Sequence, residues 1–263
     1  MILWNSLRSP HASLLLLLFA LLLQLPSVQA QLVVGSAPDV ELRYLVDLPT
    51  AGTLRRGEAA LDLQAGGRGT LLVKGSIGVS NRFSLGLSYG GTSLLGTGKP
   101  GLYPLPGVFA TFRIFDESKT APALLIGFDS QGRRGIVEGS RNYEIKSPGF
   151  YAVLSRNYVF YGTMSTHVGV NYSFEHYDGR EQPNFFGGVE KSIGEFASCV
   201  VEYNAGLNNA WGAGNNGKGF LNVGLWINLG AGMAIGASAR DLLESSPEGG
   251  ERIIQLQYVF DPE

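Results

Sequence analysis

The most constraining feature of the chain is an alternation of apolar and polar residues that runs from Glu58 to Phe260. Each stretch has an apolar side chain at every second position and ends at Gly, Asn or Pro. The segment 221–229 shows the pattern with Leu221, Val223, Leu225, Ile227 and Leu229. Because successive side chains of a β-strand point to opposite faces, each stretch is predicted to have one apolar and one polar face. The chain is therefore predicted to be all-β, as a soluble sandwich or as a barrel in lipid.

The N-terminus has the pattern of a secretory signal. Arg8 supplies a positive charge, Leu14–Leu25 is a nearly unbroken apolar run, and Val28–Ala30 offers small residues at a cleavage point. We predict a signal peptide over residues 1–30. The alternative is a membrane anchor, but the apolar run is shorter than the ~20 residues that a spanning helix needs.

Composition excludes several classes of protein. The formal net charge is −2 and 16% of the residues are charged, so no nucleic-acid partner is expected. The chain has a single cysteine, Cys199, which cannot form an internal disulfide and is predicted to lie on the apolar face. No His/Cys cluster has the spacing of metal ligands, so neither a metal nor another cofactor is expected.

The connections between strands favour a membrane barrel over a sandwich. Short turns alternate with long loops along the chain, as in outer-membrane barrels, which have short periplasmic turns and longer external loops. The longest predicted loops are 93–106, 131–148 and 207–217. An even number of strands would also place both termini of the barrel chain in the periplasm. We predict twelve strands, at 57–66, 69–80, 82–92, 107–117, 121–130, 149–160, 164–176, 183–192, 196–206, 218–229, 232–242 and 251–260.

Aromatic residues gather near the ends of the predicted strands. Membrane–water interfaces favour aromatic side chains, so these residues are candidates for two girdles. The periplasmic candidates are Phe83, Phe112, Tyr158, Phe160, Tyr258 and Phe260. The outer candidates are Tyr89, Phe128, Phe174, Phe185 and Tyr203. The alternative is an aromatic sandwich core.

Charged residues on the other face are predicted to point inward, because a charge on the lipid face costs ~2–4 kcal/mol at the midplane. The predicted lumen-lining residues are Glu58, Asp62, Lys74, Arg113, Asp129, Glu175, Glu190, Glu202 and Arg240. Twelve strands give a barrel roughly 24 Å across. These charges either line a narrow channel, which would modestly favour cations, or pair across the lumen and close it.

Catalysis has little support in the sequence. His167 and His176 lie at opposite ends of one predicted strand, and Ser173 is three residues before His176. Residues three apart in a strand point to opposite faces, so a Ser–His site is not expected there. We predict that the protein is not an enzyme, and keep a lipid or glycan hydrolase as an alternative.

Several segments resemble a group of bacterial outer-membrane barrels similar to YjbH-type proteins. They are residues 48–58, 88–91, 126–132, 149–153 and 184–191, of which the first reads LPTAGTLRRGE. YjbH-type proteins are associated with exopolysaccharide biosynthesis or export and are often longer, so this chain resembles one barrel module. The last strand also resembles the C-terminal signal read by the barrel assembly machinery, but Asp261–Glu263 follow the terminal Phe260.

The sequence thus predicts a transmembrane antiparallel β-barrel in the bacterial outer membrane. The expected regions are a signal peptide (1–30), a periplasmic lead-in (31–56) and the barrel (57–263). The expected function is a passive pore or envelope component linked to exopolysaccharide export, and the expected partners are outer-membrane lipid, the assembly machinery and polysaccharide or export components. A further alternative is a structural or adhesive barrel that binds an external partner through its long loops.

Overall fold

The computed structural model describes residues 41–213 and 217–260. The predicted signal peptide and residues 31–40 lie outside the described residues. The described part contains one large antiparallel sheet of thirteen strands, in which β4 (Gly101–Leu102) adds only a short edge to β3. The other strands are β1 (Ala59–Ala65), β2 (Leu71–Ser80), β3 (Phe83–Thr92), β5 (Gly107–Phe115), β6 (Ala123–Asp129), β9 (Gly149–Val159), β10 (Thr163–Tyr172), β11 (Asn184–Ile193), β12 (Ala197–Asn204), β13 (Phe220–Gly230), β14 (Met233–Arg240) and β15 (Glu251–Phe260).

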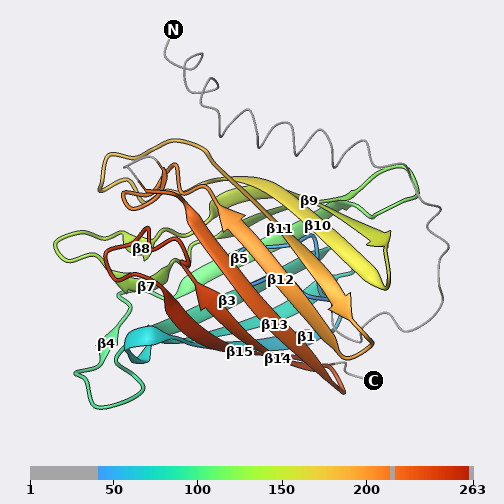
Figure 1. Cartoon of the computed structure of the whole chain (residues 1–263), viewed down its shortest axis with the longest axis horizontal. Coiled ribbons are helices and arrows are strands. Elements are labelled where there is room, and N and C mark those ends of the chain that lie inside the picture. Colours follow the sequence, from blue (N-terminus) through green and yellow to red (C-terminus); the bar gives the residue numbers. More distant parts are fainter. Residues whose placement is uncertain (1–40, 214–216, 261–263) are drawn as a thin grey trace, which may run out of the picture. The chain divides into compact units, whose positions relative to one another are not determined.

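These twelve strands form a closed barrel. Each one pairs with its neighbour along the chain, and β1 pairs with both β2 and β15 (Figure 1). The register joins Leu63 of β1 to Leu256 of β15 on one side and to Val73 of β2 on the other. Closure satisfies the backbone donors and acceptors that an open edge would leave exposed to lipid. The twelve strands predicted from the sequence are confirmed.

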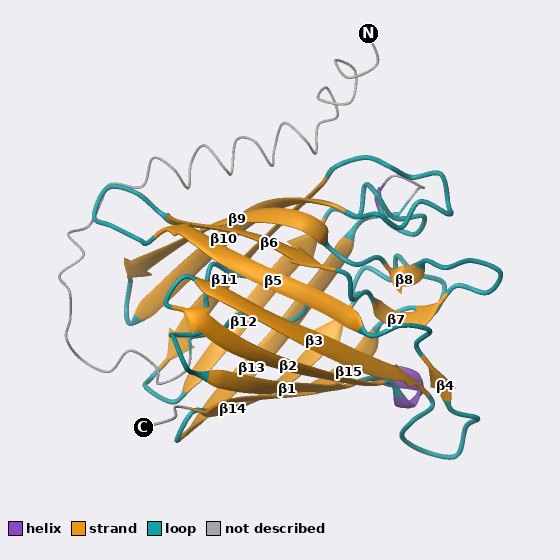
Figure 2. Ribbon diagram, turned by 180° about the vertical axis from the view of Figure 1, so that it is seen from behind, coloured by secondary structure: helices purple, strands orange, loops and turns teal. Residues whose placement is uncertain are grey.

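The connections are sorted by length between the two ends of the barrel (Figure 2). The tight turn 81–82 and the short turn 194–196 lie at one end. The loops at the other end carry β4, the hairpin of β7 (Arg133–Ile136) and β8 (Tyr143–Ile145), and the short 3-10 helix η2 (Gly67–Gly69). Among the described residues, no helix is long and apolar enough to cross a membrane.

The barrel wall separates apolar from polar side chains. In β13, Asn222 and Trp226 are buried inside, whereas Leu225 and Leu229 are 40% and 57% exposed on the outside. Other large apolar side chains on the outer face, such as Leu87, are exposed to a similar degree. Soluble proteins rarely expose apolar surface of this extent. The closed sheet and its apolar outer belt place the barrel in the bacterial outer membrane.

The interior is filled by the segment of chain that precedes β1. Residues 41–54, here called the plug segment, include Leu45, Val46 and Leu54, which are 0%, 1% and 2% exposed. Leu45 and Val46 cluster with Val200 and Trp226 of the barrel strands, and Leu48 and Ala51 cluster with Leu125 and Val153. The predicted periplasmic lead-in, residues 31–56, contains this segment, and the structure places 41–54 within the barrel. The apolar side chains of this segment gain from burial, and its polar groups find partners on the charged wall.

Candidate functional site

The plug segment folds back on itself inside the barrel. The Leu45 N–H donates to the Leu48 carbonyl, and the Thr50 N–H donates to the Arg43 carbonyl, both at 3.0 Å. The Thr50 hydroxyl also donates to the Leu42 carbonyl at 2.6 Å. These bonds make a compact turn whose outer groups face the barrel wall.

The carboxylate of Glu202 in β12 holds the tip of this turn. One oxygen accepts from the N–H groups of Val46 and Leu48 at 2.9 and 3.0 Å. The other accepts from the Asp47 N–H at 2.9 Å and from the Asn222 amide at 2.6 Å. These four N–H groups all donate to one side chain, so Glu202 anchors the tip of the turn through hydrogen bonds.

Asp47, at the tip of the turn, lies between two arginines. Arg240 of β14 holds the carboxylate with two parallel bonds, Nε to Oδ2 at 2.6 Å and Nη2 to Oδ1 at 2.7 Å. Arg133 of β7 adds a bond from Nε to Oδ1 at 3.1 Å. Burial raises the pKa of Asp47, but Arg240 and Arg133 outweigh it and lower this pKa to about 2. The three side chains are all buried, so this group of charges is held out of water.

Further ion pairs and hydrogen bonds hold the rest of the plug segment. Lys74 of β2 donates to Asp129 of β6 at 2.7 Å and to the Tyr44 hydroxyl at 3.3 Å. Burial and the nearby Asp129 carboxylate raise the pKa of Tyr44 well above its usual value, so its hydroxyl stays protonated. Arg113 of β5 donates to the Ala51 carbonyl at 2.8 Å. Arg43 pairs with Asp62 of β1.

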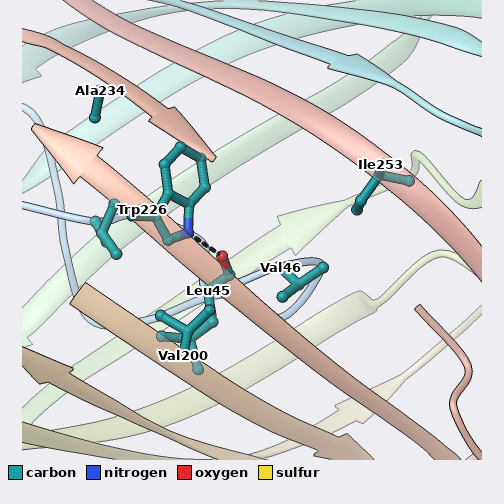
Figure 3. Close-up of a cluster of buried hydrophobic side chains, with 7 residues drawn as sticks. Leu45, Val46, Val200, Trp226, Ala234 and Ile253 are labelled. Carbon is teal, nitrogen blue, oxygen red and sulfur yellow. Dashed lines mark hydrogen bonds between the residues drawn. The ribbon is translucent and has the colours of Figure 1, made fainter. Parts of the chain in front are cut away.

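An apolar cluster packs the other side of the turn. The Trp226 indole N–H donates to the Leu45 carbonyl at 2.7 Å, and both residues belong to a buried cluster with Val46, Val200 and Ile253 (Figure 3). A Cβ atom at Gly188 would lie 2.3 Å from Leu45 Cδ1, so glycine is needed for this close approach.

The β7–β8 hairpin and neighbouring loops cover the end of the barrel that carries the long loops. Arg134 pairs with Glu251 at 2.8 Å, and Tyr103 and Tyr143 pack edge to face with their ring centroids 5.1 Å apart. Arg68, from η2, pairs with Glu144 in β8. Burial raises the pKa of Tyr103 to about 12. The hairpin is thereby tied to the barrel wall and to other loops.

Two small cavities lie beside the plug segment among the described residues. A cavity of about 30 Å³ is lined by Asp47, Arg133 and several asparagines. A second cavity, of about 20 Å³, lies beside Tyr44 and Asp62. Each has room for only about one or two water molecules. The part of the barrel that contains the plug segment is therefore filled by side chains in this structure.

The predicted lumen-lining residues fall into three groups. Those that touch the plug segment or its partners are Asp62, Lys74, Arg113, Asp129, Glu202 and Arg240. Glu58 and Glu190 are half-buried near the end with short turns, and Glu58 accepts from the Arg55 N–H. Glu175 lies beyond β10 and accepts from the backbone N–H groups of Tyr143 and Ser147, so it belongs to the loops. Whether these residues line a conducting path stays a prediction.

The predicted girdle residues lie on the outer face of the barrel. Phe112, Phe160, Phe260, Tyr89, Phe174 and Phe185 are exposed, and Phe83, Tyr158, Tyr258, Phe128 and Tyr203 are half-buried. Phe150, which the sequence analysis did not select, joins Phe128 and Phe174 in a cluster with centroids 5.0 and 5.6 Å away. Contact of these rings with a membrane interface stays a prediction.

The two histidines in the described part of the chain, His167 and His176, have different partners. His176 bonds the backbone carbonyl of Ser173 at 2.7 Å, so it does not meet the Ser173 hydroxyl. His167 Nδ1 lies 2.8 Å from the Ser155 hydroxyl across β9 and β10, a contact the sequence analysis missed because the register was unknown. The Ser155 hydroxyl also accepts from the Ala51 N–H, so it supports the plug segment.

No known family model matches the sequence, and no curated protein is significantly similar to it. Among solved structures, the KdgM porin in complex with disordered oligogalacturonate is similar with a TM-score of 0.51 and 12% identity, over 78% of this chain and 99% of that one. A further KdgM porin structure has a TM-score of 0.48 and 12% identity, over 78% and 99%. A NanC porin structure has a TM-score of 0.43 and 10% identity, over 78% and 100%. The first likeness confirms the fold of an outer-membrane barrel; the resemblance to YjbH-type proteins stays a prediction.

Proposed function

We propose that the protein is a passive outer-membrane pore for small polar solutes, and that the plug segment closes it in this structure. The observation that carries the proposal is that the barrel closes without the plug segment. The strand β1 begins at Ala59 and pairs on both sides with barrel strands. The segment 41–54 therefore lies inside a wall that is already complete.

The way the plug segment is held supports its release. Its backbone hydrogen bonds to other backbone groups join described residues of the segment itself, such as Leu45 to Leu48. Its bonds to the wall go through side chains, among them Glu202 and Arg240. Each such bond contributes about 0.5–1.5 kcal/mol net, or about 1.5–3 kcal/mol where a charge takes part. Release of the segment costs these bonds but breaks no strand ladder.

The inner face of the barrel wall around the plug segment is polar enough to be hydrated. Polar and charged side chains such as Lys74, Asp129 and Asn222 cover much of the inner face, and these groups are costly to bury without partners. A barrel of twelve strands is roughly 24 Å across, which leaves ~10 Å between opposing side chains. Without the plug segment, water and small polar solutes would satisfy these groups.

A disulfide between the plug segment and the wall tests the proposal. The Thr53 and Ser84 hydroxyl oxygens are 2.9 Å apart, so Thr53→Cys with Ser84→Cys brings two thiols together. The native thiol is removed by Cys199→Ala. We expect single-channel conductance of the reduced protein in planar bilayers and its loss after oxidation. The variants with one cysteine each are the controls, and oxidation should leave their conductance unchanged.

Two results would overturn the proposal. One is a trace without openings at every voltage, both for the reduced protein and for a variant that lacks residues 41–54. The other is equal conductance of the oxidised and reduced forms of the double-cysteine variant. Either result would show that release of the plug segment does not open a path.

A permanently closed structural barrel is the second candidate. The observation that favours it is the number of buried charge pairs around the plug segment, including Lys74 with Asp129 and Arg240 with Asp47. This candidate predicts no conductance in any variant that keeps the plug segment. The same bilayer recordings therefore separate the two functions.

A role in exopolysaccharide export would assign the proposed pore to a biological pathway. Its support is the sequence resemblance of segments such as 126–132 and 184–191 to YjbH-type proteins. Deletion of the gene is expected to lower the secreted polysaccharide of the source bacterium. Unchanged secretion would remove this part of the proposal and leave the pore untouched.

A further inference from the structure

Asp47 occupies a site that is built for a carboxylate. The Arg240 guanidinium donates two parallel hydrogen bonds to its carboxylate, and Arg133 donates a third. Both arginine side chains are buried. The planar guanidinium fork matches the geometry of a carboxylate. The residue that fills the site belongs to a segment that can leave the barrel under the proposed function.

Arg133 depends on Asp47 for its charge pairing. Among the described residues, the ion pair of Arg133 is with Asp47, whereas Arg240 also pairs with Glu251. Removal of Asp47 therefore leaves the buried Arg133 guanidinium without a carboxylate partner. A buried unpaired cation is costly, so the vacant site favours a new anion.

The surroundings of the carboxylate point to hydrogen-bond donors on the same ligand. Next to Asp47, Glu202 accepts from the backbone N–H groups of Val46 and Leu48, and it loses these donors when the plug segment leaves. The adjoining cavity is lined by amide side chains that both donate and accept. These are Asn171, Asn184, Asn204, Asn208 and Asn209.

We propose that Arg133 and Arg240 form a binding site for a small polyhydroxylated carboxylic acid, such as a sugar acid, and that Asp47 is its internal substitute. The ligand's carboxylate takes the place of the Asp47 side chain. Its hydroxyl groups donate to Glu202 in place of the N–H groups of residues 46–48 and bond to the asparagines. The inference rests on the proposed function, because the ligand and the plug segment cannot occupy the site together.

Competition with Asp47 sets the direction of the expected effect. A ligand that binds only the open form has its apparent affinity reduced by the fraction of open molecules. Asp47→Ala removes the competing carboxylate and also weakens the hold on the plug segment. The variant should therefore bind a sugar acid more tightly than the wild type does.

The test is calorimetric titration of the full mature chain in detergent with D-glucuronate. We expect Asp47→Ala to lower the apparent Kd at least tenfold relative to the wild type. Asp47→Ala with Arg240→Gln should lose this gain. Asp47→Ala with Arg82→Gln is the control for loss of an arginine and should keep it, because Arg82 pairs with Asp116 at the end of the barrel with short turns. D-glucose and inorganic phosphate, which lack the carboxylate, should bind at least tenfold more weakly than D-glucuronate.

The results separate failure of the site from failure of the pore. If Asp47→Ala conducts in bilayers but does not bind D-glucuronate, the site is wrong and the pore stands. If the disulfide experiment has already excluded opening, the proposed function fails first. Equal loss of binding in the Arg240 and Arg82 variants, or equal binding of phosphate, would overturn the inference by showing unspecific attraction of anions. If Asp47→Ala does not fold, Asp47→Asn replaces it with the same expected outcomes.

Discussion

At the scale of single residues, the interior depends on charges that are buried in pairs. Lys74 and Asp129 are 4% and 0% exposed, and their side chains meet at 2.7 Å. The Lys74 ammonium also lies over the rings of Tyr44 and Phe109, at 4.4 and 5.0 Å from the ring centroids. Removing one member of a buried pair leaves the other without compensation, which costs more than the pair contributes.

The first prediction concerns this pair. Lys74→Met is expected to lower the free energy of unfolding by about 3–5 kcal/mol, because it leaves the buried Asp129 carboxylate without its cation. Lys74→Met with Asp129→Asn should recover most of this loss, since the amide still accepts from the Gln131 N–H. The measurement is urea unfolding in lipid vesicles, followed by the gel shift between folded and unfolded barrel. Additive effects of the two substitutions would show that the pair is not coupled.

At the scale of elements, the barrel strands could be predicted and the plug segment could not. Strands such as β13 face lipid on one side and polar groups on the other, so apolar and polar residues alternate along their sequence. Leu42, Leu45, Val46 and Leu48 follow no period of two, because the segment packs as a turn against several strands. The β7–β8 hairpin likewise lies within the predicted loop 131–148 and was not predicted.

The inward position of the charged wall residues could be predicted for a related reason. Their placement follows from the cost of a charge in lipid, so Lys74, Glu202 and Arg240 were expected inside. Their partners could not be predicted, because Asp47 lies 193 positions from Arg240 in the chain. The six carboxylates and three cations of the predicted lumen-lining set indicated a need for further cations, such as Arg43 beside Asp62, but gave no signal for Asp47.

The second prediction concerns depth along a strand. Leu225 and Leu229 both point outward from β13, but Leu225 lies at its middle and Leu229 near the short turn. Leu225→Arg is expected to cost about 2–4 kcal/mol of folding free energy in a bilayer, and Leu229→Arg about 0–1 kcal/mol. Urea unfolding in lipid vesicles measures both. Equal costs at the two positions would contradict a lipid-facing belt centred on the strand.

At the scale of the whole molecule, the described barrel has three concentric zones. The outer zone is apolar, the wall is a closed ladder of hydrogen bonds, and the inner zone is a network of charges around the plug segment. The apolar residues of the plug segment sit against Trp226 and Val200 inside, so burial of apolar surface stabilises the centre as well as the belt. The two ends differ, since long loops gather at one of them (Figure 1).

The last prediction fixes the orientation of these ends. Outer-membrane barrels carry their longer loops outside the cell, so Lys99, exposed in the loop 93–106, should face the medium, and Glu195, exposed in a short turn, should face the periplasm. In a Cys199→Ala background, Lys99→Cys is expected to react with a membrane-impermeant maleimide on intact cells. Glu195→Cys should react only after the outer membrane is permeabilised. Because the plug segment joins β1 at the end that holds Glu195, the reverse labelling pattern would also place the entry of the plug segment on the outside of the cell.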